Sequence, residues 1–452
     1  MTVHPAQLPA SFGGEIIAPT HPGYDQARQI WKGLDRRPAL IARCADVSDV
    51  QRIIEHAANG DIPLAVTGAG HDIAARSMPD GALVASTLAL DGIEIDPVHR
   101  LARVQAGVRW GSVVAAAARH GLATTGASVA TVGVAGFALH GGLGWLMRSF
   151  GTACDNIQAL DVVTADGQLR TVDARSNPDL FWAMRGAGAN FGAVTSLTLR
   201  LYPVNRVVAG VKLYPAAKAR DVLEVYRRIT AGAGDELVTH FYYNGNPDGT
   251  HSVGIGLCFN GPSATASTAL APLESLGPPT HDSVREMGID ELQAVHDAST
   301  PLGARYHLRA HYLSEFSDAA ADAILAHCRS ISAPFTQVFV EHLGGAVGRI
   351  PNDATAFRGR DARFSFLVIN GWKNPAEDSE RVAWTRAFGE AVAPHATEGA
   401  YVNYLDYDED HRIPEAYGAG YPKLRSLKRR YDPTNMFRFN RNIAPEADDE
   451  TR

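Results

Sequence analysis

Cysteine is scarce in this chain of 452 residues, and its four cysteines are too scattered to form a recognisable site. Cys44, Cys154, Cys258 and Cys328 include no C-x-x-C pair, which disfavours both a zinc site and a disulfide framework. The seventeen histidines show no H-E-x-x-H or comparable ligand spacing. We therefore expect four free, buried thiols and no metal site.

A strong charge of one sign and a long apolar run are also missing. The formal net charge of −7 and the pI near 6.2 argue against a nucleic-acid or polyanionic-lipid partner. No apolar run approaches the roughly 18 residues of a membrane span. The opening residues MTVHPAQLPASFGGE lack the basic and apolar regions of a secretory signal. These absences predict a cytoplasmic protein that binds neither nucleic acid nor membrane, and they leave its oligomeric state open.

The composition, with 45% apolar and 20% charged residues, is that of an ordinary globular protein, and the length suggests about two or three domains. Residues 37–204 alternate short strand-like runs with helices, one of them over 48–60 with Ser48 as its N-cap. Residues 205–399 read as an antiparallel sheet backed by helices. We predict an α+β fold in which residues 1–36 are an N-terminal extension, 400–446 form a polar and aromatic C-terminal segment, and 447–452 are a disordered tail.

Two glycine-rich segments carry the first functional signal. Thr67–Asp72 reads TGAGHD and follows an apolar, strand-like run, and a second cluster, GVAGFALHGGLG, begins at Gly133. Glycines let backbone amides approach a phosphate or a ring that a Cβ would block. Together the segments suggest a cofactor laid along the backbone and tethered at one point. The alternative is that the glycines form turns and the histidine is structural.

A third segment, MRGAGANFGAV, excludes a nicotinamide-type Rossmann motif. That motif needs G-x-G-x-x-G between a strand and a helix, but here Gly192 comes one residue late and the alternating run VTSLTLRLY follows. In the first loop, Ile73 occupies the position of the third glycine.

Motifs dispersed over nearly the whole chain point to one family. They are RPALIARC, the GAGH loop, TVGVAGFALHGGLGWLMRSFG followed by CDN, VVTADG, NPDLFWAMRGAGANFGAVT, YVNYLD and KLRSLKRRYDPTNMFRFNRNI. With these, the chain resembles FAD-linked oxidases of the vanillyl-alcohol-oxidase superfamily, in the bacterial berberine-bridge-enzyme-like branch that includes secondary-metabolite oxidases. The resemblance implies a two-part FAD domain of the p-cresol-methylhydroxylase type, made from residues 37–204 and 400–446, with an inserted substrate domain over 205–399.

The resemblance also implies how the cofactor is held. In this family the histidine of the glycine loop, here His71, is bonded to the 8α-methyl of the flavin. Some members add a cysteine at the position of Val129, so a single covalent link is expected; Cys154 lies at the wrong place in the motif. The implied FAD contacts are Thr67, Gly68, Ala69, Gly70, His71, Asp72, Ala130, Thr131, Val132, Gly133, Gly136, Gly141, Gly142, Gly192, Val194, Asn403, Asn440 and Asn442.

The expected reaction is hydride transfer from an alcohol, amine or phenolic carbon of a small molecule to the flavin, with O2 as electron acceptor and H2O2 as product. Tyr404 matches the family's second tyrosine in Y-x-N-Y and is the first candidate for the base, although a phenol with a pKa near 10 needs help from a neighbour. In FTQVFVEHL, strand alternation places Glu341 with Gln337 and Phe339 on one face and His342 on the other. An ionisable residue in such an apolar strand is either a pocket residue or a strand-edge residue, so Glu341 is a pocket candidate with a strand-edge position as the alternative.

Further aromatic candidates for the substrate pocket are weaker. They are Tyr306, His307 and Tyr312, for which a core position is the alternative. Two other functions remain open: a dehydrogenase that passes electrons to another acceptor, and a flavin-binding protein without catalysis.

Overall fold

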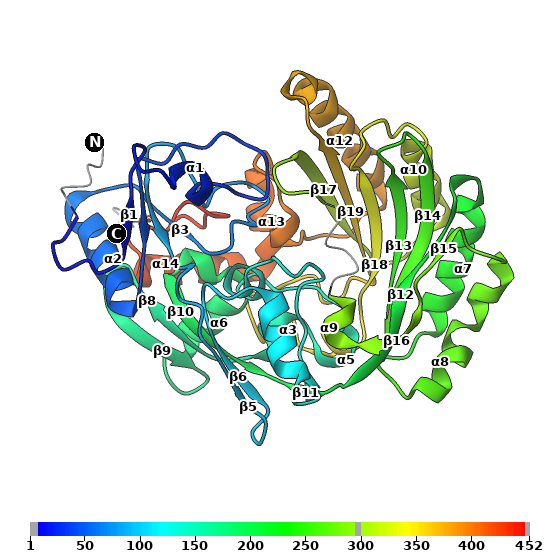
Figure 1. The fold of residues 1–452 in the computed structure, drawn as a ribbon, viewed down its shortest axis with the longest axis horizontal. Helices are drawn as coiled ribbons and strands as arrows, with labels where there is room; N and C mark the ends of the chain where they lie inside the picture. The colour runs from blue at the N-terminus through cyan, green and yellow to red at the C-terminus, as the bar shows by residue number, and fades with distance from the viewer. Residues whose placement is uncertain (1–7, 294–299, 448–452) are drawn as a thin grey trace.

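The structure, a computed structural model, describes residues 8–293 and 300–447. Its first group of strands forms three sheets (Figure 1). The strand orders are β1 (Glu15–Ile17), β2 (Leu40–Arg43), β4 (Leu83–Ser86), β3 (Leu64–Thr67); then β5 (Ile93–Asp96), β6 (Leu101–Gln105), β10 (Ala193–Arg200), β8 (Ile157–Val163), β9 (Leu169–Asp173); and β11 (Tyr202–Pro203) with β7 (Leu122–Ala123).

The second group is one eight-stranded sheet, drawn from green to yellow in Figure 1. Its order is β15 (His281–Asp282), β12 (Arg206–Pro215), β14 (His251–Phe259), β13 (Leu237–Gly245), β18 (Gln337–His342), β19 (Phe364–Trp372), β17 (Arg305–Leu313), with β16 (Arg285–Gly288) also paired to β12. Its strand pairs are all antiparallel.

Helices complete both groups. They are α1 (Tyr24–Ala27), α2 (Val47–Gly60), α3 (Trp110–Ala118), α4 (Val134–Ala138), α5 (Met147–Phe150), α6 (Pro178–Ala187), α7 (Ala219–Gly232), α8 (Ser263–Leu270), α9 (Ile289–Leu292), α10 (Asp318–Cys328), α11 (Ala346–Arg349), α12 (Asp378–Val392), α13 (Ile413–Tyr417) and α14 (Tyr421–Tyr431). This mixture of helices with parallel and antiparallel strands confirms the α+β class.

One face of the eight-stranded sheet is sealed by helices. Apolar side chains of α7, α10 and α12, such as Tyr226, Ile324 and Phe388, form a core with the strand residues Phe241 and Val340. Because strand side chains alternate between faces, their neighbours on β13, β18 and β19 point to the opposite side, away from this core. That opposite face is available for a site.

The N-cap of α2 corrects one local prediction. Asp46, not Ser48, caps the helix: its side chain accepts a hydrogen bond from the Asp49 amide, and the helix begins at Val47. Ser48 lies in the first turn and donates its hydroxyl to Asp46. Asp and Ser are comparable N-caps, so composition alone does not choose between two candidates two residues apart.

The C-terminal segment returns to the first group of strands. In Figure 1, α14 lies beside β8 and α6 on the side of the first group of strands, and α13, in orange, lies between the two groups. Two hydrogen bonds hold this segment in place: the buried Lys428 ammonium donates to the Asn190 carbonyl at 2.7 Å, and the Asn440 side-chain amide donates to the Ala189 carbonyl at 2.8 Å.

Two composition-based expectations can be checked in the described part of the chain. All four cysteines are free and buried, as predicted. Within residues 8–293 and 300–447, the helices are too short or too polar to cross a bilayer. Of the predicted disordered tail over 447–452, Ala447 is described and its carbonyl accepts the Arg429 guanidinium at 3.1 Å. Residues 448–452 lie outside the described residues, as do the first seven residues of the predicted extension.

Candidate active site

A cavity of about 380 Å³ lies between the two groups of strands. One side is formed by two stretches, residues 67–73 and 127–137, which we call the glycine wall and most of whose residues line the cavity. The other, the sheet wall, consists of His240 and Tyr242 of β13, Gln337, Phe339 and Glu341 of β18, and Leu367 and Ile369 of β19. The C-terminal segment closes the cavity with Tyr401, Asn403, Tyr404, Asn440 and Arg441.

The first half of the glycine wall is the loop that leaves β3 at Thr67. Gly70 has a φ of +74°, which favours glycine, and a Cβ there would stand 3.2 Å from the Gln29 carbonyl oxygen. The Gly70 carbonyl accepts the Trp31 amide at 2.8 Å. The loop is thereby pinned to the preceding segment, with the His71 side chain at the cavity.

The cavity face of the glycine wall fits a bound cofactor. A Cβ added to Gly136 would meet no protein atom within 4 Å, and one added to Gly68 would meet only ordinary contacts, the nearest at 3.5 Å. Packing inside the protein therefore does not require glycine at these positions. Their bare backbone instead leaves room that a ligand can fill.

Several lining residues also have buried polar atoms without a hydrogen-bond partner in the protein. They include Thr67 Oγ1, His140 Nε2, Asn440 Oδ1 and the Nε of Arg441. Buried polar groups in proteins are nearly always satisfied, so such a cluster around one cavity is what a site for a polar ligand requires. The donor and acceptor types suit the phosphates, ribityl hydroxyls and ring edge of FAD.

His71 is held in its neutral form. Its Nε2 lies 2.9 Å from the Thr131 hydroxyl, which comes from the second half of the glycine wall. Burial, reinforced by the charge of Arg109, lowers the pKa of His71 to about 4. Val129 also lines the cavity, at the position where some family members have a second attachment residue.

Asp72 organises the loop with its side chain. One carboxylate oxygen accepts the Arg441 guanidinium, and the other accepts the amides of Arg76 at 2.6 Å and Ser77 at 3.2 Å. Burial would raise the pKa of Asp72, but Arg441 and the Arg76 amide bring it below its usual value. The ion pair ties the glycine wall to the C-terminal segment.

Most of the predicted cofactor residues line this cavity. They are Thr67, Gly68, Ala69, Gly70, His71, Asp72, Val132, Gly133, Gly136, Gly192, Val194, Asn403 and Asn440. Ala130, Thr131, Gly141, Gly142 and Asn442 are not among its lining residues, although Thr131 reaches His71.

Gly141 and Gly142 serve packing instead. A Cβ on Gly141 would come within 2.5 Å of the Phe357 ring, and one on Gly142 within 2.5 Å of Ala153. The Gly142 amide donates to the Tyr401 hydroxyl at 2.9 Å, so this amide is already engaged by the protein. The sequence pattern does not distinguish a glycine that faces a ligand from one that faces a side chain.

The two predicted catalytic residues meet at the cavity. Tyr404 ends a short 3-10 turn, Val402–Tyr404, and its hydroxyl donates to Glu341 Oε1 at 3.2 Å. Gln337, Phe339 and Glu341 all line the cavity, as strand alternation predicts, while His342 points the other way and contacts Arg148.

Electrostatics make Glu341 the stronger proton acceptor of the pair. Its burial raises the pKa to about 7, against hydrogen bonds from Ser365 and Tyr404 that lower it. Burial also raises the pKa of Tyr404 well above its usual value, and the neighbouring Glu341 charge adds to this rise. Near neutral pH the phenol therefore keeps its proton, and the carboxylate is poised to take one.

The weaker aromatic candidates do not line the cavity. Tyr306 stacks on Trp31 with a centroid distance of 4.2 Å and donates to the Pro301 carbonyl. His307 is fully buried beside Asp408, and Tyr312 is a buried core side chain. These three residues therefore pack in the protein interior and are not part of the pocket.

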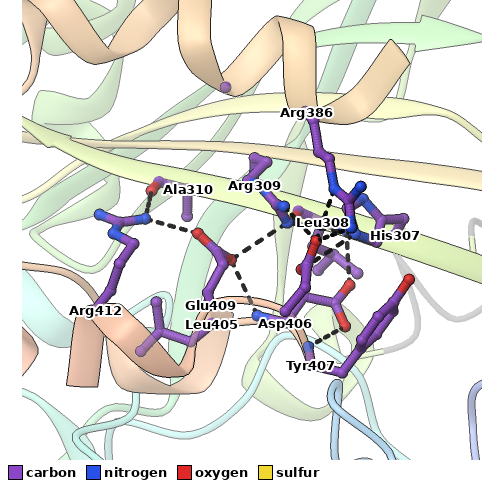
Figure 2. A network of polar contacts seen from close by, with 12 residues as sticks. His307, Leu308, Arg309, Ala310, Arg386, Leu405, Asp406, Tyr407, Glu409 and Arg412 are labelled. Atoms are coloured by element: carbon purple, nitrogen blue, oxygen red, sulfur yellow. Dashed lines mark hydrogen bonds and ion pairs between the residues drawn. The ribbon is translucent and has the colours of Figure 1, made fainter. Parts of the chain in front are cut away.

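The segment after Tyr404 is anchored by a polar network, shown in Figure 2. Asp406 accepts the buried Lys32 ammonium at 2.7 Å and the Leu308 amide of β17 at 2.9 Å. Asp408 pairs with Arg309, and Glu409 pairs with Arg412. The network joins the N-terminal segment, the large sheet and the C-terminal segment at the point where Tyr404 enters the cavity.

Sequence reasoning missed Arg441, His240, Tyr242 and Tyr401 as cavity residues. Arg441 stands between the two asparagines that were predicted, and Tyr401 is the first tyrosine of the same Y-x-N-Y motif. Those motifs carried the available signal. His240 and Tyr242 show only the alternation of a strand, because their neighbours in the site come from remote segments.

Within residues 8–293 and 300–447, no three His, Cys, Asp or Glu side chains are grouped so that they could bind a metal ion.

Comparisons with known proteins agree with this geometry. Residues 38–173 match the family model of an FAD binding domain, and residues 400–444 match the model "Berberine and berberine like". The chain is 30% identical over 460 residues to (R)-6-hydroxynicotine oxidase of Paenarthrobacter nicotinovorans, covering 97% of this chain and 98% of the relative. The chain belongs to the berberine-bridge-enzyme-like family of FAD-linked oxidoreductases.

Other relatives extend the comparison. A crystal structure of 6-hydroxy-D-nicotine oxidase from Arthrobacter nicotinovorans superposes with a TM-score of 0.87 at 30% identity, over 97% of this chain and 99% of that one. Xylooligosaccharide oxidase of Thermothelomyces thermophilus is 26% identical over 441 residues, covering 90% of this chain and 87% of the relative. The family resemblance, the fold type and FAD as the cofactor are thereby confirmed, and the protein is an oxidoreductase.

Proposed function

We propose that this protein is an FAD-dependent oxidase of a small organic molecule, with the glycine wall holding the cofactor and the sheet wall holding the substrate. The observation that carries the proposal is the hydrogen bond between Tyr404 and Glu341 at the cavity, facing a wall whose glycines leave room for a ligand. When bound, FAD supplies the hydride acceptor and passes two electrons to O2, which leaves as H2O2.

The cofactor domain is proposed to be discontinuous, with residues 37–204 and 400–446 as its two parts and 205–399 as the substrate domain. The Asp72–Arg441 ion pair and the Asn440–Ala189 hydrogen bond support it, since both join the first part to the second. The residues that would hold FAD are those of the glycine wall together with Gly192, Val194, Asn403, Asn440 and Arg441.

His71 is proposed as the single covalent attachment point. Its pKa of about 4 leaves a ring nitrogen lone pair free at neutral pH, which a bond to carbon requires. Val129 offers no second nucleophile on the same wall. Wild-type protein denatured in acid should stay yellow and fluoresce on a gel, and His71→Ala should release its flavin to the supernatant. A colourless wild-type pellet would contradict the link.

Proton removal is proposed to run through the Tyr404–Glu341 pair. The substrate's O–H or N–H proton passes to the Tyr404 oxygen as the Tyr404 proton passes to Glu341, which ends as a neutral carboxylic acid. With its pKa near 7, Glu341 accepts the proton without the cost of forming a free phenolate. This removes the difficulty of a tyrosine base at neutral pH.

An oxygen electrode with a peroxide assay tests the function, using a panel of amines, alcohols, sugars and phenols. We expect O2 uptake with equal H2O2 release. Anaerobic bleaching of the flavin without O2 uptake in air would instead indicate a dehydrogenase with another acceptor. Failure of every compound to bleach the flavin would favour a non-catalytic flavin-binding protein.

A further inference from the structure

The sheet wall presents its side chains in cross-strand rows. His240, Glu341 and Ser365 lie opposite one another on β13, β18 and β19, and the next row contains Tyr242, Phe339 and Leu367. Tyr242 meets Phe339 edge-on, with ring centroids 5.0 Å apart. Figure 1 shows these three strands side by side in the centre of the sheet. The rows place one acidic group at the edge of an aromatic and aliphatic surface.

The charges around the cavity are unevenly distributed. Among the described residues that line it, the Asp, Glu, Lys and Arg side chains are Asp72, Arg441 and Glu341. Asp72 and Arg441 neutralise each other on the cofactor side. Glu341 faces the tyrosine hydroxyl, and no Arg or Lys contributes to the shift of its pKa. Among the described residues, an ionised Glu341 therefore has no Arg or Lys to balance it, and the titratable group opposite it on β13 is His240.

An unbalanced buried carboxylate selects ligands by charge. Burial costs the carboxylate its hydration, and attraction to a neighbouring cation offsets that cost. A neighbouring anion would instead be repelled, and strongly so in a medium of low dielectric constant. The surrounding Phe339, Leu367 and Ile369 give the rest of a ligand an apolar surface to cover.

We propose that the substrate is a small amine with an apolar, ring-sized body, whose protonated nitrogen donates to Glu341, and that carboxylates and phosphates are excluded. The inference rests on the proposed function and deepens it by naming the substrate class. The ammonium gives one proton to Glu341, through Tyr404 or directly. The adjacent C–H hydrogen then leaves with its electron pair to the cofactor, and the substrate becomes an iminium ion.

Three isosteric probes test the class on the purified FAD-loaded protein: benzylamine, benzyl alcohol and benzoate. Binding is followed anaerobically through changes in the flavin absorbance at about pH 8, where Glu341, with its pKa near 7, is ionised and the amine is protonated. We expect benzylamine to bind at least about tenfold more tightly than either of the other two. Tighter binding of benzoate, equal binding of all three, or no binding of benzylamine at millimolar concentration would overturn the proposal.

Matched variants assign the preference to one side chain. Glu341→Gln should remove the advantage of the amine over the alcohol while keeping the cavity's shape. Gln337→Lys places a cation on the same strand face and should let benzoate bind, whereas Gln337→Met controls for the lost amide. If Glu341→Gln, with wild-type flavin content and melting temperature, keeps the amine preference, the proposal is wrong. Binding shifts the absorbance bands of the oxidised flavin and reduction bleaches them, so the two are scored separately. A protein that ranks the probes as expected but consumes no O2 therefore refutes the oxidase function alone.

Discussion

The two walls of the cavity are built on opposite principles. The glycine wall presents backbone and small side chains, and its atoms are supplied by two short stretches of sequence. The sheet wall presents large side chains from three strands more than a hundred residues apart at their extremes, among them His240, Phe339 and Leu367. A backbone wall suits a cofactor of fixed shape, because amides are the same in every sequence. A wall of side chains changes with each substitution, so under the proposed function it is the wall that sets substrate preference.

The relatives illustrate this division. One similar protein is a nicotine-type oxidase and another is a xylooligosaccharide oxidase, yet both match nearly the whole chain. The C-terminal segment belongs to both walls: Arg441 is paired to the glycine wall, and Tyr404 is bonded to the sheet wall. Changes confined to one wall should therefore affect either cofactor retention or chemistry, and changes in the anchor of this segment should affect both.

The largest expected effect comes from removing the hydroxyl of Tyr404, the group proposed to transfer the substrate proton. Tyr404→Phe should slow anaerobic flavin reduction about 10²- to 10⁴-fold, the usual contribution of one well-placed proton-transfer group, while FAD content stays unchanged. The measurement is stopped-flow reduction with an amine identified in the screen. Tyr243→Phe, on the opposite face of β13, is the matched control and should leave the rate unchanged. An unaltered rate in Tyr404→Phe would leave Glu341 to act alone.

The anchor between the walls should matter for stability. Lys32 and Asp406 are both almost fully buried and 2.7 Å apart. Lys32→Met leaves an unpaired buried carboxylate, so the free energy of unfolding measured in urea should fall by about 3–5 kcal/mol. Adding Asp406→Asn should restore part of the loss. Arg37→Met, which breaks an exposed pair with Asp35, should change stability little; an equal effect would show that burial is not the cause.

The glycine wall can be tested by filling it. Gly136→Leu adds a side chain whose Cβ would meet no packing neighbour within 4 Å, so the protein should fold but lose most of its FAD. Gly232→Leu, at an equally open position at the end of α7, should keep full FAD content. The flavin-to-protein absorbance ratio and the melting temperature report both outcomes. Stoichiometric FAD in Gly136→Leu would show that the cofactor does not use this space.

The smallest expected effect is a pH dependence. Glu341 must be ionised to accept a proton, so flavin reduction should rise about tenfold per pH unit up to its pKa near 7 and then level off. In Glu341→Gln, the rate of flavin reduction should no longer rise with pH in this range.

Stability should change in the opposite sense. Because the folded pKa of Glu341 is raised above the unfolded value, the stability it contributes is complete at acid pH and is lost as pH rises through about 7. The difference in melting temperature between Glu341→Gln and the wild type should therefore shift in favour of the variant between about pH 5 and pH 8. A constant difference would contradict the raised pKa.

Local patterns account for what could be predicted. The loop of His71 is predictable because closely spaced glycines directly after a strand mark a turn at which the backbone can come close to a ligand. The shared face of Gln337, Phe339 and Glu341 follows from the two-residue period of a strand. The exchange of Ser48 for Asp46 as N-cap, and the packing role of Gly141 and Gly142, show the limit of the same reasoning. Each of these residues is suited to its predicted role, and a neighbour in space decides whether it takes that role.

The sequence by itself determined the α+β class, the family and the short glycine-rich segments that line the cavity, because motifs and periodicities are properties of neighbouring residues. Only the tertiary structure brought Glu341 to Tyr404, Asp72 to Arg441 and Lys32 to Asp406. These partners are 63, 369 and 374 residues apart, respectively. Their protonation states depend on burial and on the charge opposite. Burial and the opposite charge both arise only when remote segments pack together, so the tertiary structure decides the chemistry of the site.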